Sequence, residues 1–140
     1  MLPLLSTLSP NAAVLILTAG LVLIALELNR PGSILPGSAG VLVTLLAAAS
    51  LISRHVEPMP AIVAASCIGV LLLGARRWLS WWIIAATTGV LIFSIEELLP
   101  AAPGPKVSVW AAATSGLILG EGITILTRIA HRARQNKGLD

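Results

Sequence analysis

Acidic side chains are the residues of this 140-residue chain whose type and position could do chemistry. Four of the six acids lie within or at the end of apolar stretches, namely Glu27, Glu96, Glu97 and Glu121. A carboxyl group inside a bilayer is unfavourable, so such residues mark candidate sites of proton transfer, ion binding or helix pairing.

Glu121 stands between two glycines, Gly120 and Gly122, well inside an apolar stretch. Glycine lets another helix backbone approach closely. One interpretation is an interhelical hydrogen bond or an ion pair, for example with Arg128. The other is a proton or ion relay, which needs a second acid, lysine or histidine deep in an apolar stretch, and the sequence offers none.

The other acids lie at the ends of apolar stretches. Glu27 precedes Arg30 by three residues, so on a continuing helix the two would share a face and form an ion pair that closes the helix. The alternative is a contact with a partner or with the neighbouring loop. Glu96 and Glu97 are either a solvated pair or an outward-facing cation or proton site.

The histidines and the cysteine give little evidence for a metal, cofactor or catalytic site. His55 and His131 have no second ligand at metal-binding spacing, although either could ligate a pigment or haem. Cys67 is the sole cysteine and suits a small packing position. The sequence also lacks a nucleophile elbow, a phosphate-binding loop and a zinc signature. We therefore predict no enzyme activity, no metal site and no cofactor.

Composition points to a membrane protein. Hydrophobic residues make up 56% of the chain and charged residues 11%, whereas soluble domains carry about 25% charged residues. The net charge of +3 resides at the ends of apolar runs, which favours a role in topology over nucleic-acid binding. Residues 1–10 lack a basic start, so we expect no cleaved signal peptide.

The elements that must position these residues are long apolar helices separated by proline and glycine. We predict an all-α, single transmembrane domain, a polytopic bundle of about five helices. These helices are expected at residues 11–28, 37–53, 59–75, 79–99 and 107–127, and a short basic cytoplasmic tail at 128–140.

Charge and indole positions predict an orientation with the N-terminus outside and the C-terminus inside. Five spans place most cations on one side: Arg30, Arg76, Arg77, Arg128, Arg132, Arg134 and Lys137. The other side receives Arg54 and Lys106. Tryptophans, which anchor helices at the headgroup level, stand near helix ends: Trp78, Trp81, Trp82 and Trp110.

Small residues predict where helices pack. Gly116 and Gly120 form a Gly-xxx-Gly pair, which continues into Glu121 and Gly122. A faint repeat at an offset of 69 residues would be inverted in the membrane, as in transporter repeats. It matches Thr18, Gly20, Glu27, Pro31 and Pro36 with Thr87, Gly89, Glu96, Pro100 and Pro105.

The most specific pattern joins the first two predicted helices. An apolar helix ends at Glu27, and two Pro-Gly pairs follow, Pro31-Gly32 and Pro36-Gly37. Over residues 12–51 this resembles the membrane region of the nodulation-efficiency protein D (NfeD) family. The resemblance assigns a stiff structural hairpin to Glu27, Arg30, Pro31, Gly32, Pro36, Gly37 and Gly40.

The resemblance implies work beside stomatin-like (SPFH) scaffold proteins. Longer NfeD-like proteins carry a ClpP-class serine-protease domain and short ones a soluble OB-fold, and this sequence holds neither. We therefore expect a non-enzymatic scaffold or accessory subunit of a larger assembly in the bacterial cytoplasmic membrane. Its expected partners are the lipid bilayer, membrane proteins and further copies of itself.

Two other functions stay open. One is a small ion- or proton-coupled transporter that uses Glu121. The other is a pigment- or haem-binding membrane subunit that uses His55 or His131.

Overall fold

The computed structural model describes residues 8–29, 35–76, 80–99 and 104–136, and all regular structure in these ranges is helical. The predicted all-α class is therefore confirmed. The helices are α2 (Pro10–Asn29), α3 (Leu35–Ile52), α4 (Pro58–Arg76) and α5 (Trp81–Glu96). A last continuous helix consists of α6 (Val109–Leu117), the π-helical turn η1 (Ile118–Gly122) and α7 (Ile123–Gln135). It continues past residue 127, so the first part of the predicted tail is helical.

Local sequence explains where the helices start. The hydroxyl oxygen of Ser9 accepts a hydrogen bond from the Ala12 N–H (3.2 Å), and Pro10 opens α2. Ser108 caps α6 in the same way, by accepting from the Ala111 N–H (3.4 Å). Proline suits a first helical turn because the N–H it lacks would have no partner there.

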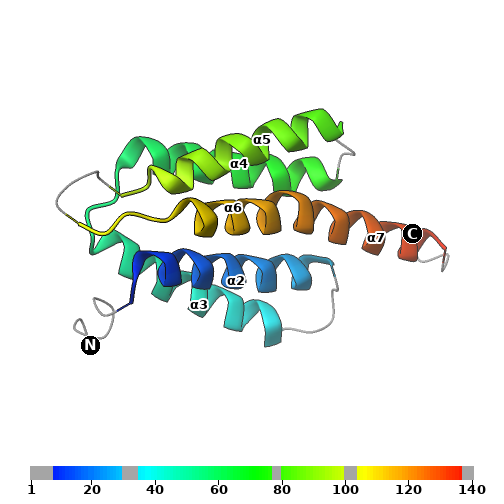
Figure 1. Cartoon of the computed structure of the whole chain (residues 1–140). Coiled ribbons are helices and arrows are strands. Elements are labelled where there is room, and N and C mark those ends of the chain that lie inside the picture. Colours follow the sequence, from blue (N-terminus) through cyan, green and yellow to red (C-terminus); the bar gives the residue numbers. More distant parts are fainter. Residues whose placement is uncertain (1–7, 30–34, 77–79, 100–103, 137–140) are drawn as a thin grey trace.

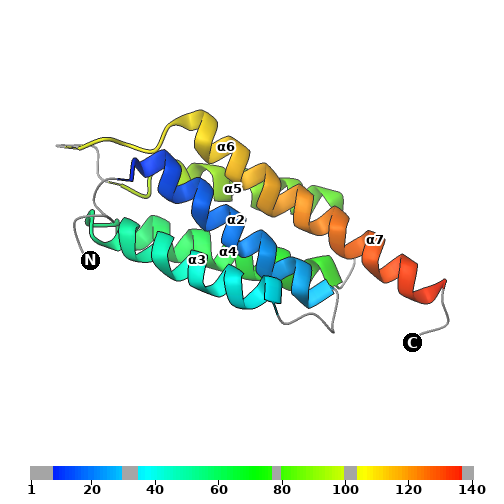
Figure 2. The ribbon, with the colours of Figure 1, turned by 90° about the horizontal axis from the view of Figure 1, so that it is seen from below.

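The helices form three tiers with roughly parallel axes (Figures 1 and 2). The α2–α3 hairpin is one outer tier and the α4–α5 hairpin is the other. The long α6–η1–α7 helix runs between them and contacts α2, α4 and α5. Its α7 end projects beyond the other helices (Figure 1).

Large apolar side chains lie on the surface of this bundle as well as in its core. Among the described residues, the buried polar side chains are all hydroxyls: Thr18, Ser50, Thr88, Ser94, Ser115, Thr124 and Thr127. Large apolar side chains are exposed on every helix, among them Leu28, Leu42, Leu45, Ile62, Leu73, Trp82, Phe93, Trp110, Leu117 and Ile129. The described charged side chains gather mainly at the two ends of the bundle.

Two helices are long and apolar enough to cross a membrane. They are α2, with 20 residues, and the 25-residue stretch Val109–Ala133 of the long helix. The other apolar helical segments are shorter: Pro36–Ile52, Pro58–Leu73 and Trp81–Glu96.

Candidate functional site

Two asparagines join α2 to the long helix, one at each end of the bundle. At one end the side-chain oxygen of Asn11 accepts from the Ser108 N–H (2.8 Å). At the other end Asn29 donates to the hydroxyl oxygen of Thr127 (3.1 Å) and to the Ala25 carbonyl (2.9 Å). Since both helices run from the Asn11 end to the Asn29 end, α2 and the long helix are parallel.

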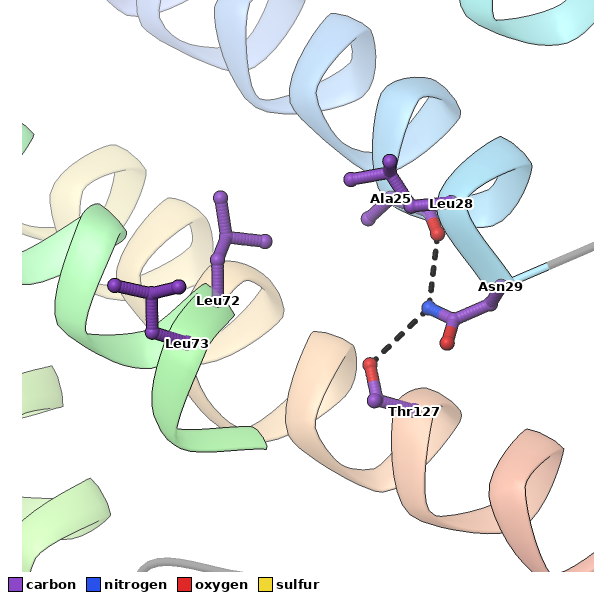
Figure 3. Close-up of a pocket in the computed structure, with 6 residues that line it drawn as sticks. All are labelled: Ala25, Leu28, Asn29, Leu72, Leu73 and Thr127. Carbon is purple, nitrogen blue, oxygen red and sulfur yellow. Dashed lines mark hydrogen bonds between the residues drawn. The ribbon is translucent and has the colours of Figure 1, made fainter. Parts of the chain in front are cut away.

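Figure 3 shows the Asn29 end, which borders a cavity of about 180 Å³. Its lining is Ala25, Leu28, Asn29, Leu72, Leu73 and Thr127. The two polar groups in this lining bond each other, and the rest is apolar. This cavity offers no converging set of groups for chemistry.

The first hairpin is held by a close approach of two backbones at glycines. A side-chain carbon added at Gly40 would lie 2.8 Å from the Gly20 carbonyl oxygen and 2.9 Å from the Leu23 Cβ. A Cβ added at Gly20 would collide with the Thr44 side chain and would lie 2.9 Å from the Thr44 backbone nitrogen. Only glycine fits at either position without moving a helix.

Glu27, which the hairpin motif singled out, lies against Gly37 in the first turn of α3. A Cβ at Gly37 would collide with the Glu27 carboxyl group, whose Oε1 would be 3.0 Å away. The Oε2 atom is buried and has no hydrogen-bond partner in the described part of the chain. The N-terminus of a helix favours negative charge, so α3 provides a suitable electrostatic environment for this acid.

The other hairpin residues divide into two groups. Pro36 is half-buried in the first turn of α3, and Gly37 and Gly40 are buried. Arg30, Pro31 and Gly32 lie outside the described residues.

The Gly-xxx-Gly pair of the long helix receives two side chains of α5. A Cβ at Gly120 would lie 2.9 Å from the Thr88 Cβ, and one at Gly116 would meet the Ile92 side chain, with Cδ1 at 3.3 Å. Thr88 and Ile92 are four residues apart, and so are Gly116 and Gly120. Two side chains one helical turn apart therefore pack over two glycines one turn apart. The α5 helix therefore packs closely against the long helix.

The next two residues behave differently. Glu121 is half-buried and Gly122 is exposed, and both belong to the outward-facing part of η1. A Cβ at Gly122 would meet only the Leu117 carbonyl oxygen, at 3.9 Å. No hydrogen bond or ion pair joins Glu121 to another described residue, and its pairing with a cation stays a prediction.

The π turn explains how the buried residues stay on one side. Buried positions repeat every four residues: Ala111, Ser115, Leu119, Ile123 and Thr127. Four residues overshoot one α-helical turn by ~40°, so this series would rotate off its face in a regular α-helix. The wider π turn at Ile118–Gly122 takes up the extra residue and restores the alignment.

The described tryptophans lie on exposed surface near helix ends. Trp81 and Trp82 begin α5, and Trp82 is 85% exposed. The Arg128 guanidinium carbon lies 4.7 Å from the centre of the Trp81 ring, a cation–π distance. Trp110 is exposed near the start of α6, and Trp78 lies outside the described residues.

The remaining candidates are not brought together. His55 is exposed, with a φ of 62°, in the turn after α3, and exposed His131 contacts Gln135 at 3.2 Å. Cys67 is buried in α4. Among the described residues there is no group of three or more histidine, cysteine or acidic side chains that could hold a metal ion.

The acids of the transporter hypothesis also lie apart. Glu27 is near the end of α2, Glu96 is the last residue of α5, and Glu121 faces outward on the long helix. The matched positions of the faint 69-residue repeat do not pack alike. Gly20 is buried against α3, whereas its counterpart Gly89 is exposed with nothing within 4 Å.

Sequence reasoning missed the residues that join the helices, Asn11, Asn29 and Thr88. The available signals were one asparagine at each end of the first apolar run and the four-residue spacing of the small residues Ala112, Gly116, Gly120 and Thr124.

Comparison with known proteins adds no relative. No family model, no curated protein and no solved structure matches this chain.

Proposed function

We propose that this chain is a polytopic membrane protein whose five helices all cross the bilayer, with the N-terminus outside and the C-terminus in the cytoplasm. The apolar surface on every helix carries this proposal. A soluble core helix is mostly buried, whereas 28% of the apolar window of α2 and 44% of that of the long helix are buried. Membrane bundles bury small and hydroxyl residues at helix contacts and expose large apolar ones to lipid.

Helix direction supports five spans over two. Because α2 and the long helix are parallel, the chain between them must cross the membrane an odd number of times. The three intervening helices, α3, α4 and α5, supply three crossings. The long helix from Ser108 to Thr127 is ~28 Å in length at ~1.5 Å per residue. That matches a hydrocarbon core of ~30 Å.

Within the membrane we propose a non-enzymatic role, as a scaffold or accessory subunit that binds other membrane proteins through its helices. Its described interior combines apolar side chains with glycine contacts and hydroxyls, and two asparagines pair its helices. The contact of Glu27 with Gly37 gives the NfeD-like hairpin pattern a physical purpose. The resemblance to NfeD proteins makes a stomatin-like (SPFH) scaffold protein in the bacterial cytoplasmic membrane the first partner to seek.

Topology is tested with single cysteines in a Cys67→Ala background. His55, Ser80, Lys106 and Gln135 are exposed: His55 follows α3, Ser80 precedes α5, Lys106 precedes α6 and Gln135 is the last residue of α7. We expect a membrane-impermeant maleimide, added to intact cells, to label His55→Cys and Lys106→Cys. Ser80→Cys and Gln135→Cys should react only after the membrane is opened. Labelling of Ser80→Cys in intact cells would contradict five spans.

The scaffold role is tested by mild-detergent extraction of tagged protein from its own membrane, followed by mass spectrometry. We expect a stoichiometric membrane-protein partner. Recovery without any partner, together with a sodium or proton flux in liposomes that Glu121→Gln abolishes, would favour a transporter instead.

A further inference from the structure

A cavity of about 210 Å³ lies between the two hairpins, and we name it the α3–α4 cavity. Core side chains of three elements form its deep end, namely Val14 of α2, Ile95 of α5 and Leu119 of the long helix. Each of these is 6% exposed or less, so the cavity reaches the centre of the bundle. Its sides are α3 and α4, which contribute four alanines: Ala48, Ala61, Ala64 and Ala65. Their small side chains leave the space open.

The cavity opens between α3 and α4, where its two exposed lining residues lie. Ile52 of α3 is 70% exposed, and Ala65 of α4 is exposed as well. Among the described residues, α3 packs on α2 while α4 packs on α5 and the long helix, and no comparable contact joins α3 to α4. In the membrane arrangement proposed above, on which this inference rests, the mouth therefore faces the acyl chains of the bilayer.

The lining of the cavity is unsuitable for water. Thr18 is the one polar side chain in it, and the Thr18 hydroxyl already donates to the Val14 carbonyl (2.9 Å). A buried water needs ~2–4 polar partners, and apolar cavities of ~150 Å³ stay dry and take up small apolar molecules instead. A void with no contents would lose dispersion contacts along its whole wall. The ligand that matches this lining is therefore a hydrocarbon.

A polar turn borders one end of the cavity. Ile52 and Val56 line the cavity, and the three residues between them are Ser53, Arg54 and His55. The backbone N–H of Glu57 donates to the Leu98 carbonyl (3.0 Å), which holds this turn against the end of α5. A molecule whose hydrocarbon chain enters the cavity can thus keep a polar headgroup beside the turn, at the membrane surface.

We propose that the α3–α4 cavity binds one acyl chain of a phospholipid from the outer leaflet. Its alkyl lining matches the chain, and the polar turn lies at the level of that lipid's headgroup. The α4 lining runs from Ala61 to Ile68, ~10 Å at ~1.5 Å per residue, so the cavity holds part of a chain. Phospholipid chains are the most abundant hydrocarbon in a bilayer, so mass action favours them over scarcer apolar molecules. The bound chain fills the space between the two hairpins.

The test is photo-crosslinking of the full chain in mild detergent with phosphatidylcholine that carries a diazirine on one acyl chain. Light converts the diazirine to a carbene that reacts with its immediate neighbours, and mass spectrometry locates the adducts. We expect adducts to gather on residues 48–52 and 61–68, which line the cavity, and to be sparse on the exposed face of residues 83–90. A free fatty acid with the same diazirine is the second probe, and it should label these segments less because it lacks the phospholipid headgroup.

Two neighbouring alanines of α3 give a matched pair of variants. Ala48→Phe places a ring in the cavity, and we expect about fivefold less labelling of residues 61–68. Ala49→Phe, on the exposed surface of the same helix and outside the cavity lining, should leave this labelling within about twofold. Ala65→Leu narrows the mouth at an exposed position that tolerates a larger side chain, and it should lower the labelling about threefold.

Even labelling of all exposed apolar segments, in a chain that resists alkaline carbonate extraction, would overturn the cavity site and leave the membrane proposal standing. Equal losses in Ala48→Phe and Ala49→Phe would also overturn the site. Labelling by the fatty acid as strong as that by phosphatidylcholine would overturn the phospholipid as its occupant. Release of the chain by alkaline carbonate would overturn the membrane proposal, and this site with it.

Discussion

The two hairpins of this bundle use glycine in opposite ways. In the α2–α3 hairpin Gly20 and Gly40 are buried where the two backbones meet. In the α4–α5 hairpin Gly69 and Gly89 would meet nothing within 4 Å if a Cβ were added. The buried residues there carry side chains, including Leu71, Ile84 and Leu91. One hairpin brings two backbones together at buried glycines, whereas the glycines of the other have no neighbour and its buried positions carry side chains.

The contrast between the two hairpins shows that a glycine in an apolar helix does not by itself mark a packing contact. Its role depends on which face of the helix meets a neighbour. Substitutions at matched glycines therefore test the comparison directly, with unfolding free energies measured by titrating detergent-solubilised protein with a denaturing detergent.

Gly40→Leu should have the largest effect. Its side chain would collide with the Gly20 carbonyl, a backbone atom that moves only with its helix. We expect a loss of ~3 kcal/mol or more in unfolding free energy. The matched change Gly69→Leu, on the open face of α4, should stay within ~0.5 kcal/mol of the unmodified chain. Equal losses would contradict the contrast between the hairpins.

Two glycines within the π turn give the next comparison. Gly120→Val would press on the Thr88 side chain, and we expect a loss of ~2 kcal/mol. Gly122→Val faces outward and should change the unfolding free energy of the monomer by less than ~0.5 kcal/mol. Thr88→Ala should recover part of the loss in the Gly120→Val background. Without that recovery, the Thr88 contact would not be the cause.

Gly37→Ala should cost less than Gly40→Leu, because the colliding Glu27 carboxyl is the end of a flexible side chain. We expect a loss of ~1 kcal/mol. Since the two residues touch, the combination with Glu27→Ala should be non-additive, with a coupling of ~1 kcal/mol in a double-mutant cycle. Strictly additive losses would show that this contact adds nothing to the hairpin.

Asn29→Ala should have the smallest effect, because hydrogen bonds between membrane helices contribute ~0.6 kcal/mol on average. It removes the bond to Thr127 that joins the first hairpin to the long helix. Thr127→Val should give a similar loss, and the double variant should lose little more than either alone. A double variant with twice the single loss would mean that the two side chains act independently.

Several features could be predicted from sequence because they are local. Apolar runs of helical length, interrupted by proline and glycine, predicted an all-helical chain and the five segments that the structure contains. The Gly-xxx-Gly spacing drew attention to Gly116 and Gly120, both of which contact α5. Nothing in the spacing separated them from Gly122, which faces outward.

The helical class and the approximate extent of the helices therefore follow from local sequence alone. Only the tertiary structure decided that α2 and the long helix are parallel, that Thr88 fills the space over Gly120, and that Glu121 points outward. The physical reason is that helices α2 to α5 are apolar on all sides, so no amphipathic period marks an inner face. That face is chosen by the fit between small residues and side chains that lie far apart in the chain.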